Sequence, residues 1–417
     1  MNSEKCFLFF IRAYNDIDHL TPIMYKLKSD NPNFVIKAIV IDLENKYIED
    51  FRIVFLIQRG ISILHITDLI SSSRIQIEIY SIILTIRKKL SKNNPLRKII
   101  NFIMFRFMKD LFKKQLQKLS VEVFLTKLLE GNQGVLVFDQ SYVAFYERLI
   151  SYCLQNKITT VAVPHGHNTF DNELIWTTSM DVNFNSSTMQ RPFHFQRVVF
   201  ENFIVSERYI NLNIVTRSQV TVLGSTRFSD EWMKKIREIL PPVVLPNLDR
   251  KILRIVFMMS KPKYNGNSEE VERTIKYLSN FPDVFIMIKP HTRGMKFKTQ
   301  FGENVVIVDN EFHSPCLIDW ADLVLFTMTS VIFDCLKSDK PALYLKNTHS
   351  NRLLSERYFH SWEVHCRDDL RKFIWALKEN RKARTYSVEE RDLYCKEVID
   401  PIGKDVLEYY SSFLANL

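Results

Sequence analysis

Two fixed cations and an imidazole stand together in one short stretch of the chain, as Lys289, His291 and Arg293. The stretch follows the apolar run 285–288, which has the length and composition of a buried parallel strand. Parallel sheets bind ligands just beyond the carboxyl ends of their strands. We therefore expect these three side chains to bind a phosphate.

A hydroxyl-rich segment, 327–330, follows a second apolar run at 323–326. A helix is predicted from 331 to 336, and the start of a helix attracts anions. Thr329 and Ser330 also suit the helix-capping role, which is compatible with phosphate binding. Ser260 and Lys261, after another expected strand of the same half, are placed to face the same ligand. Together these residues form a predicted phosphate clamp.

The first half of the chain carries its own polar groups at strand ends. Asp139 ends the apolar run 135–138, and His165 and His167 flank Gly166 after a predicted strand at 159–163. Histidine titrates near neutral pH and suits a general base. Asp139 is a candidate base or nucleophile, or a residue that orients His165. The plainer alternatives are an Asx turn or helix cap for Asp139 and a backbone-bonded loop residue for His165.

Several common site motifs are absent from the sequence. There is no GxGxxG, GxxxxGK[ST], GxSxG, CxxC or HExxH, which argues against conventional dinucleotide sites, P-loops and simple zinc sites. Asp16 and Asp18 have DxD spacing but lie far from the clamp in sequence. Because lysine, arginine, histidine and a helix start can neutralise phosphate charge, we expect neither a metal nor a cofactor.

These groups must be positioned by strands that alternate with helix-length segments, a pattern typical of α/β proteins with parallel sheets. Three prolines between 241 and 246 predict a linker. We expect a first domain at 1–240, a linker at 241–250 and a second domain at 251–390. The prediction is two facing Rossmann-like domains whose strand-end loops share a cleft.

Composition agrees with an ordinary globular protein, because 46% of the 417 residues are hydrophobic and 25% are charged. No apolar run approaches the roughly 18 residues that span a bilayer. The apolar block 6–11 reads as a first strand rather than a signal peptide, so we expect a cytoplasmic protein. The six scattered cysteines indicate reduced thiols.

Positive charge is concentrated in one basic helical insert at about 83–120. Between Arg87 and Lys118 there are eleven lysines and arginines and one acid, Asp110, which equals the net charge of +10 of the whole chain. Wound as a regular helix, 100–113 gathers Ile100, Met104, Phe107, Met108 and Leu111 on one side, with Arg106, Lys109 and Lys113 on the other.

An amphipathic basic helix of this kind suits the surface of an anionic membrane, with Arg106, Lys109, Lys113 and Lys114 as membrane-binding candidates. Two other readings stay open. The apolar side can pack on the first domain, or the basic face can bind a polyanionic glycan. We expect no nucleic-acid partner, since the remainder of the chain is close to neutral.

Four segments occur in an order that resembles a known family: VPHGHN at 163–168, LGSTRF at 223–228, KPHTR at 289–293 and TMTSVIFDCLKSDKPALYL at 327–345. The series is similar to the GT-B transferases of bacterial surface polysaccharides. These include the Kdo and sialic acid transferases of capsule and O-antigen assembly and the CDP-glycerol glycerophosphotransferases of teichoic acid synthesis. The family's usual His-Pro pair is here His291-Thr292, with proline before the histidine.

The resemblance implies a metal-independent GT-B glycosyltransferase whose C-terminal helix crosses back to the first domain at 391–417. Apolar anchors on an expected helix from 388 to 414 are Tyr394, Val398, Val406, Tyr409 and Phe413. The donor would be nucleotide-activated, with a cytidine nucleotide such as CMP-Kdo favoured. The acceptor would be a growing, often lipid-linked, surface glycan such as capsule or lipopolysaccharide at the inner face of the cytoplasmic membrane.

Three alternatives remain at this point. One is a CDP-alditol phosphotransferase of the same superfamily, and another is a UDP-sugar 2-epimerase, which shares the architecture. The third is a non-catalytic protein that binds nucleotides or glycans. Hydrolysis of a donor would separate the enzymes from the binding protein.

Overall fold

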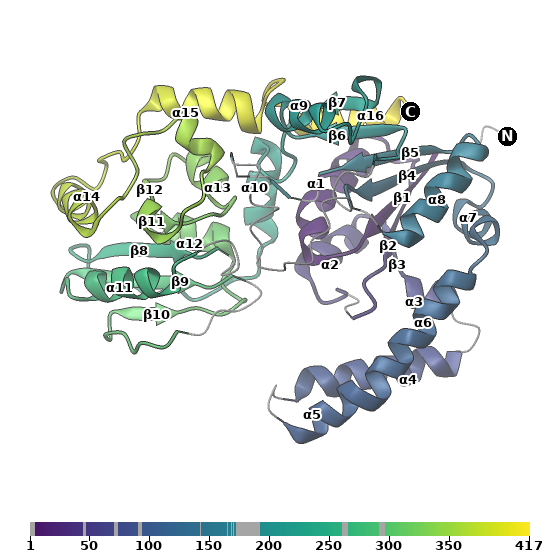
Figure 1. The fold of residues 1–417 in the computed structure, drawn as a ribbon, viewed down its shortest axis with the longest axis horizontal. Coiled ribbons are helices and arrows are strands. Elements are labelled where there is room, and N and C mark those ends of the chain that lie inside the picture. Colours follow the sequence, from purple (N-terminus) through teal and green to yellow (C-terminus); the bar gives the residue numbers. More distant parts are fainter. Residues whose placement is uncertain are drawn as a thin grey trace.

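The chain forms two parallel sheets, each covered by helices (Figure 1). The computed structural model describes residues 5–44, 47–70, 74–90, 94–141, 143–164, 166, 167, 169, 171, 192–260, 266–291 and 297–417. Within these residues the first sheet has seven strands and the second has five. The expected α/β architecture with two Rossmann-like domains is confirmed.

The first sheet has the strand order β3-β2-β1-β4-β5-β6-β7. Chain order therefore reverses between β1 and β4, which is the point where open parallel sheets bind ligands. Its strands are β1 Lys5–Ile11, β2 Val35–Val40, β3 Ser62–His65, β4 Gln133–Asp139, β5 Thr159–Val163, β6 Arg197–Phe200 and β7 Val220–Val222. Its helices are α1 Tyr14–Asp30, α2 Phe51–Gln58, α3 Ile66–Ile70, α4 Arg74–Lys89, α5 Pro95–Ile99, α6 Arg106–Lys118, α7 Val121–Leu129, α8 Ala144–Gln155, α9 Phe203–Asn211 and α10 Asp230–Ile239.

The second sheet has the order β10-β9-β8-β11-β12, so its reversal lies between β8 and β11. Its strands are β8 Leu253–Met258, β9 Val284–Lys289, β10 Val305–Ile307, β11 Leu323–Phe326 and β12 Ala342–Tyr344. The helices of this half and of the C-terminal segment are α11 Ser268–Ser279, α12 Ser314–Trp320, α13 Ile332–Lys337, α14 Arg367–Glu379, α15 Val388–Tyr394 and α16 Val406–Ala415.

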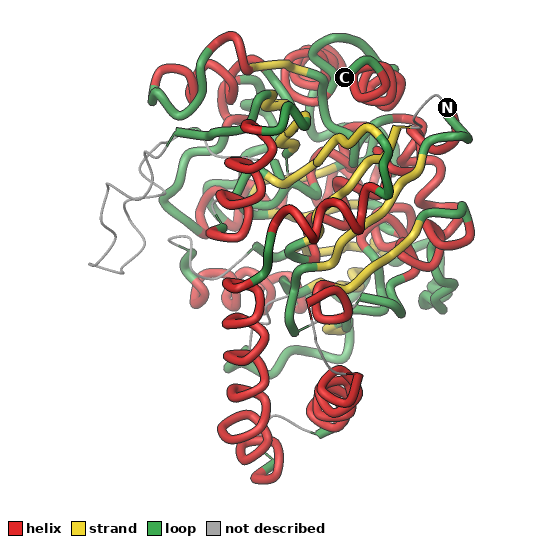
Figure 2. Tube along the Cα trace, turned by 90° about the vertical axis from the view of Figure 1, so that its right-hand side faces the viewer, coloured by secondary structure: helices red, strands yellow, loops and turns green. Residues whose placement is uncertain are grey.

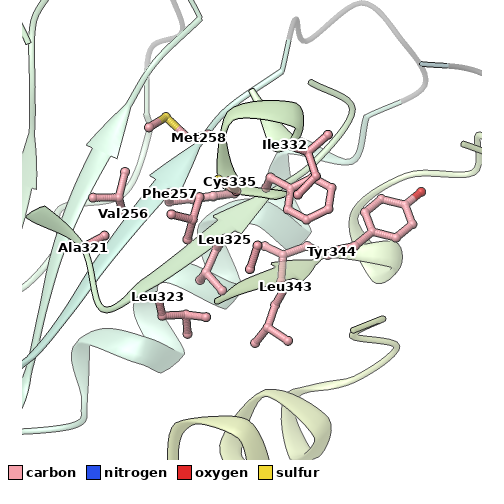
Figure 3. Packing of buried hydrophobic residues seen from close by; sticks show 14 of the residues in the cluster. Val256, Phe257, Met258, Ala321, Leu323, Leu325, Ile332, Cys335, Leu343 and Tyr344 are labelled. Atoms are coloured by element: carbon pink, nitrogen blue, oxygen red, sulfur yellow. The ribbon is translucent and has the colours of Figure 1, made fainter. Parts of the chain in front are cut away.

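The central strands are apolar on both faces, as expected for strands sandwiched between helix layers. In β1, Leu8 and Phe10 belong to one core cluster, and Phe7 and Phe9 belong to the cluster on the opposite face. Figure 3 shows the second domain, where side chains of β8, β11, β12 and α13 interdigitate; all of those labelled are buried. Core clusters of this kind, on both faces of the first sheet and around the second, hold the strand ends in fixed positions.

The C-terminal segment crosses from the second domain to the first, as Figure 1 shows for α15 and α16. Val406, Leu407, Tyr410 and Leu414 share a core cluster with α1 of the first domain. The expected single helix from 388 to 414 is wrong, because α15 passes through a π-helical turn, Cys395–Ile399, and then ends. Pro401 follows at once, and proline cannot continue a helix.

Helices α4, α5 and α6 form an arm that extends from the first domain (Figures 1 and 2). Between α5 and α6 the chain makes a second π-helical turn, Ile100–Phe105. A π turn rotates the following residues relative to a regular helix, so the predicted apolar side is formed only in part, and Leu111 packs against the core of the first domain. Ile100 and Met108 are buried inside the arm, whereas Phe107 is 67% exposed.

Candidate active-site cleft

A cleft of about 610 Å³ separates the two domains, and both contribute to its walls. The first domain supplies the loop after β1 and parts of α2 and α10. The second supplies Lys289 at the end of β9 and the segment that follows β10. Its polar and charged lining residues are Arg12, Asn15, Asp18, Arg52, Arg227, Lys289, Asn310, His313, Ser314 and Asp334.

The described residues of the predicted phosphate clamp lie at the carboxyl edge of the second sheet. Lys289 pairs in register with Met258 of β8, and Met258 pairs with Phe326 of β11, so the three strand ends lie side by side. The Ser260 backbone N–H donates to Thr327 Oγ1 over 3.1 Å. This bond joins β8 and β11 across the reversal point of the sheet, where ligands bind.

Lys289 reaches the cleft, where its Nζ donates to the backbone oxygen of Asp309 over 2.5 Å. Burial lowers the pKa of Lys289 from its ordinary value. His291, two residues further along the chain, is half-buried. Lys261 and Arg293 lie outside the described residues.

The hydroxyls of the second stretch stand before α13. Thr329 Oγ1 accepts the Val331 N–H over 3.4 Å, and α13 begins at Ile332. The predicted capping role is not seen, because the N-cap residue of α13 is Val331 and no side chain caps the helix. Ser330 accepts the Phe333 N–H with its backbone oxygen over 3.1 Å, and both residues are half-buried.

In the first domain, Asp139 and Arg12 meet at the reversal point between β4 and β1. Arg12 donates to Asp139 Oδ2 from Nε over 3.1 Å and from Nη2 over 2.8 Å. Arg12 Nη2 also donates to Ser141 Oγ over 2.9 Å. Asp139 is fully buried and Arg12 lines the cleft, so the carboxylate contacts Arg12 rather than the open cleft.

A second carboxyl, Asp16, is buried beside this pair. Its Oδ2 accepts the backbone N–H groups of Arg12 and Ala13 over 2.7 and 2.8 Å. Among the described residues its Oδ1 has no hydrogen-bond partner. Burial, reinforced by the charge of Asp139, raises the pKa of Asp16 to about 7. One fixed cation and two buried carboxyls therefore meet behind the cleft wall, where a proton is readily held.

Of the two predicted histidines, His165 lies outside the described residues. The ring of His167 packs edge-on against Phe333 of α13 at 4.8 Å, and its Nε2 lies 2.5 Å from Ser225 Oγ. Burial, then His19 and Arg227, lowers the pKa of His167 well below its ordinary value. A neutral imidazole in this place joins the two domains.

Sequence reasoning missed a charged network on the first-domain wall. Arg52 is buried, pairs with Asp18 and Asp50, and lies 4.5 Å from the centre of the Tyr14 ring. Arg227 Nη1 lies 3.2 Å from the same Asp18. Burial disfavours the charge of Asp18, but Arg227 and Arg52 outweigh it and lower its pKa. The sequence signals were the DxD spacing of Asp16 and Asp18 and the position of Arg227 after β7. Although Asp18 is far from Lys289 in sequence, both line the same cleft.

His313 faces this network from the second domain. Its ring meets Phe51 edge-on at 4.8 Å, which makes a contact across the cleft. Burial, with Arg52 and Lys289 adding to it, lowers the pKa of His313. The residue is thus a neutral imidazole near pH 7 and a weaker base than an exposed histidine.

The cleft can neutralise a phosphate with side chains alone, since Arg12, Arg227 and Lys289 reach it. Within the described part of the chain, His, Cys, Asp and Glu side chains form no group of three suited to a metal ion.

No protein-family model and no curated protein matches this sequence. Solved structures do match. A variant of the wall teichoic acid polymerase TagF soaked with CDPG has a TM-score of 0.54 at 11% identity, over 98% of this chain and 88% of that one. The glycotransferase of kitacinnamycin has a TM-score of 0.52 at 9% identity, over 100% of both chains.

A UDP-N-acetylglucosamine 2-epimerase matches similarly, with a TM-score of 0.52 at 10% identity, over 99% of this chain and 95% of that one. These likenesses establish the fold, which is that of the GT-B class. The matched structures are a polymerase, a glycotransferase and an epimerase, so one fold serves several reactions.

Proposed function

We propose that this protein is a glycosyltransferase that moves a sugar from a nucleotide-activated donor to a surface-glycan acceptor. The observation that carries the proposal is the facing pair of strand-end sites. On the Lys289 side of the cleft, a cation stands at the end of β9, and the hydroxyl-rich segment 327–330 follows β11 at the same edge of the sheet. The Arg12 side offers a cation backed by buried carboxyls at the reversal point of the first sheet.

The donor's phosphate fits the second domain, because Lys289, His291, Thr329 and Ser330 follow neighbouring strands there. A cytidine nucleotide such as CMP-Kdo is the favoured donor. Support comes from the TagF likeness, whose crystals were soaked with CDPG. The same likeness favours a CDP-alditol phosphotransferase as the nearest variant of the proposal. Lys261 and Arg293 are proposed to complete the clamp.

Acceptor activation is assigned to the first domain. His165 stays the candidate base, and Asp139 acts through Arg12, whose guanidinium it fixes toward the cleft. Arg12 would then orient an anionic group of the acceptor or of the leaving nucleotide. Metal independence follows if Lys289 and Arg227 supply the charge that stabilises the leaving phosphate.

A UDP-sugar 2-epimerase is the second candidate, and one observation favours it. Asp16 is a buried carboxyl with a pKa of about 7, the property of a group that gives and takes a proton near neutral pH. Incubation with UDP-N-acetylglucosamine separates the two, because an epimerase yields the 2-epimer, whereas a transferase with an acceptor releases nucleotide and lengthens the glycan.

The affinity for nucleotides tests the proposal directly. CMP, CDP, UDP and GDP are screened by thermal shift, and the best is titrated by calorimetry against wild type, Lys289→Ala and His291→Ala. Loss of one charge-assisted contact of about 1.5–3 kcal/mol predicts at least tenfold weaker binding for each variant. Lys276→Ala is the matched control, since Lys276 is exposed in the last turn of α11 and does not line the cleft.

Wild-type nucleotide affinity in folded Lys289→Ala and His291→Ala proteins would show that these residues do not bind the donor's phosphate. Binding of a cytidine nucleotide without any donor breakdown or glycan extension would leave a non-catalytic binding protein instead. A uridine preference with epimer formation would establish the second candidate.

A further inference from the structure

The outer side of the helical arm carries a row of exposed isoleucines. Ile75, Ile79, Ile82 and Ile86 follow one another at spacings of four, three and four residues along α4, and their side chains are 67, 41, 58 and 41% exposed. Residues at this spacing share one face of a helix. The row therefore forms a continuous apolar strip, which we call the isoleucine ridge.

The ridge is not the core face of α4. That role belongs to Tyr80, Ile83 and Leu84, which are at most 6% exposed. The Tyr80 ring stacks on Phe105 at 5.9 Å and meets Phe112 edge-on at 4.9 Å, so it joins α4 to the returning helices. The arm is thus packed on its inner side and still presents large apolar side chains on its outer side.

The ridge continues onto α5. Ile79, Ile82, Ile83, Ile86, Leu96 and Ile100 line one groove of about 300 Å³, walled by aliphatic side chains. Leu96 and Ile99 are 51 and 54% exposed, and Phe102, in the π-helical turn, is 75% exposed. Large apolar patches of this kind on a soluble fold mark a site of interaction.

Cations accompany these apolar residues. Lys89 and Lys98 are exposed at the ends of α4 and α5, and Arg106, Lys113 and Lys114 are exposed on α6, the returning helix of the arm. Lys109 pairs with Glu44, and Arg87 Nη2 lies 3.5 Å from the same carboxylate. Because Lys109 forms this ion pair within the protein, we do not include it among the proposed membrane-binding residues.

We propose that the arm docks on the surface of an anionic phospholipid bilayer, with the isoleucine ridge, Leu96 and Ile99 entering the interface and the lysines contacting headgroups. The charge of the arm selects this occupant. A second copy of the chain would bring another cationic arm against the first, whereas an anionic surface attracts it. A soluble polyanion would match the lysines but leave the ridge in water.

The position of the arm allows such a contact. Figures 1 and 2 show α4 to α6 reaching beyond the two domains, so the arm can contact a flat surface beside the body of the protein. No helix among the described residues has the length and apolar character to cross a bilayer. Docking is accordingly interfacial, with partly buried side chains.

Vesicle flotation tests the proposal without requiring activity, so its outcome is independent of the proposed function. Full-length protein is mixed with vesicles of phosphatidylcholine and phosphatidylglycerol, or of phosphatidylcholine alone. Wild type is expected to float with the anionic vesicles at low salt, less at high salt, and weakly with neutral ones. Ile79→Asn/Ile82→Asn should reduce partition by roughly tenfold or more, because less apolar surface enters the interface.

Ile57→Asn is the matched control, since Ile57 is 49% exposed on α2, outside the arm, and should float like wild type. Lys89→Glu/Lys98→Glu should lose selectivity for anionic vesicles. Circular dichroism checks that each variant is folded. Flotation of the wild-type protein tests the proposal even if a variant does not fold. Wild type that stays with the unbound fraction would overturn the proposal. So would a dimer in sedimentation that dissociates on Ile79→Asn/Ile82→Asn substitution, because the ridge would then face a second copy.

Discussion

Replacement of Asp16 by Asn tests whether a proton is held in the carboxyl pair behind the cleft. The variant keeps an oxygen for the Arg12 and Ala13 N–H groups, which Asp16 Oδ2 accepts over 2.7 and 2.8 Å, and removes the charge. Burial and Asp139 raise the pKa of Asp16 from 3.8 to about 7. Between about pH 4 and 7 the folded protein therefore retains a proton that the unfolded chain has released.

The sign of the effect follows from linkage. Where the folded state binds more protons, stability falls as pH rises, so wild type should lose stability between pH 4 and 7. The gap between 3.8 and about 7 corresponds to at most on the order of 4 kcal/mol, at about 1.4 kcal/mol per pH unit. For a domain of this size that amounts to roughly 8–16 °C in Tm.

The assay measures Tm by thermal melts at pH values from about 4.5 to about 7.5 and compares the fall in Tm between wild type and Asp16→Asn. The control is Asp30→Asn, an exposed residue on the same helix. Asp16→Asn should show a clearly smaller fall, and Asp30→Asn should follow wild type. Identical pH profiles for wild type and Asp16→Asn would mean that Asp16 is ionised in the folded protein, and the carboxyl pair would then carry two charges.

Four further substitutions test other parts of the structure. Asp139→Asn should slow transfer and spare nucleotide affinity, as should His165→Ala; near wild-type turnover in both, measured by nucleotide release, would place acceptor activation elsewhere. Gly224→Ala should lower the free energy of unfolding by roughly 2–4 kcal/mol, because φ is +90° and an added Cβ would lie 2.9 Å from Val406 Cγ2; an unchanged melt would contradict it. Lys337→Met should cost about 3–5 kcal/mol by leaving buried Asp400, 2.6 Å from Nζ, without its cation; denaturant titration measures it.

Much of the fold could be predicted because buried parallel strands are short, continuous apolar runs. The runs at 285–288 and 323–326 are β9 and β11 to within a residue or so, and each ends at the polar group expected of it. The clamp could be anticipated for the same reason, since parallel strands place their carboxyl ends on one edge. Ser260 and Thr327 were both expected there, and they share a hydrogen bond.

What could not be predicted depends on tertiary partners or on local departures from regular helices. The pairing of Arg12 with Asp139 joins residues 127 positions apart, and nothing local marks it. The π-helical turn Ile100–Phe105 has no proline or glycine to announce it, yet it turns Phe107 outward and Ile100 and Met108 inward. The break at Pro401 has a local cause, since proline cannot continue a helix, but the apolar spacing on either side of it is also compatible with one continuous helix.

The position of a bound nucleotide decides the central claim. A crystal structure with CDP should place the phosphates beside Lys289 and the loops after β8 and β11, with Arg12 and Arg227 facing them across the cleft. Phosphates bound at the Arg12–Asp139 end of the first sheet, with the Lys289 side empty, would contradict the assignment of donor and acceptor sides.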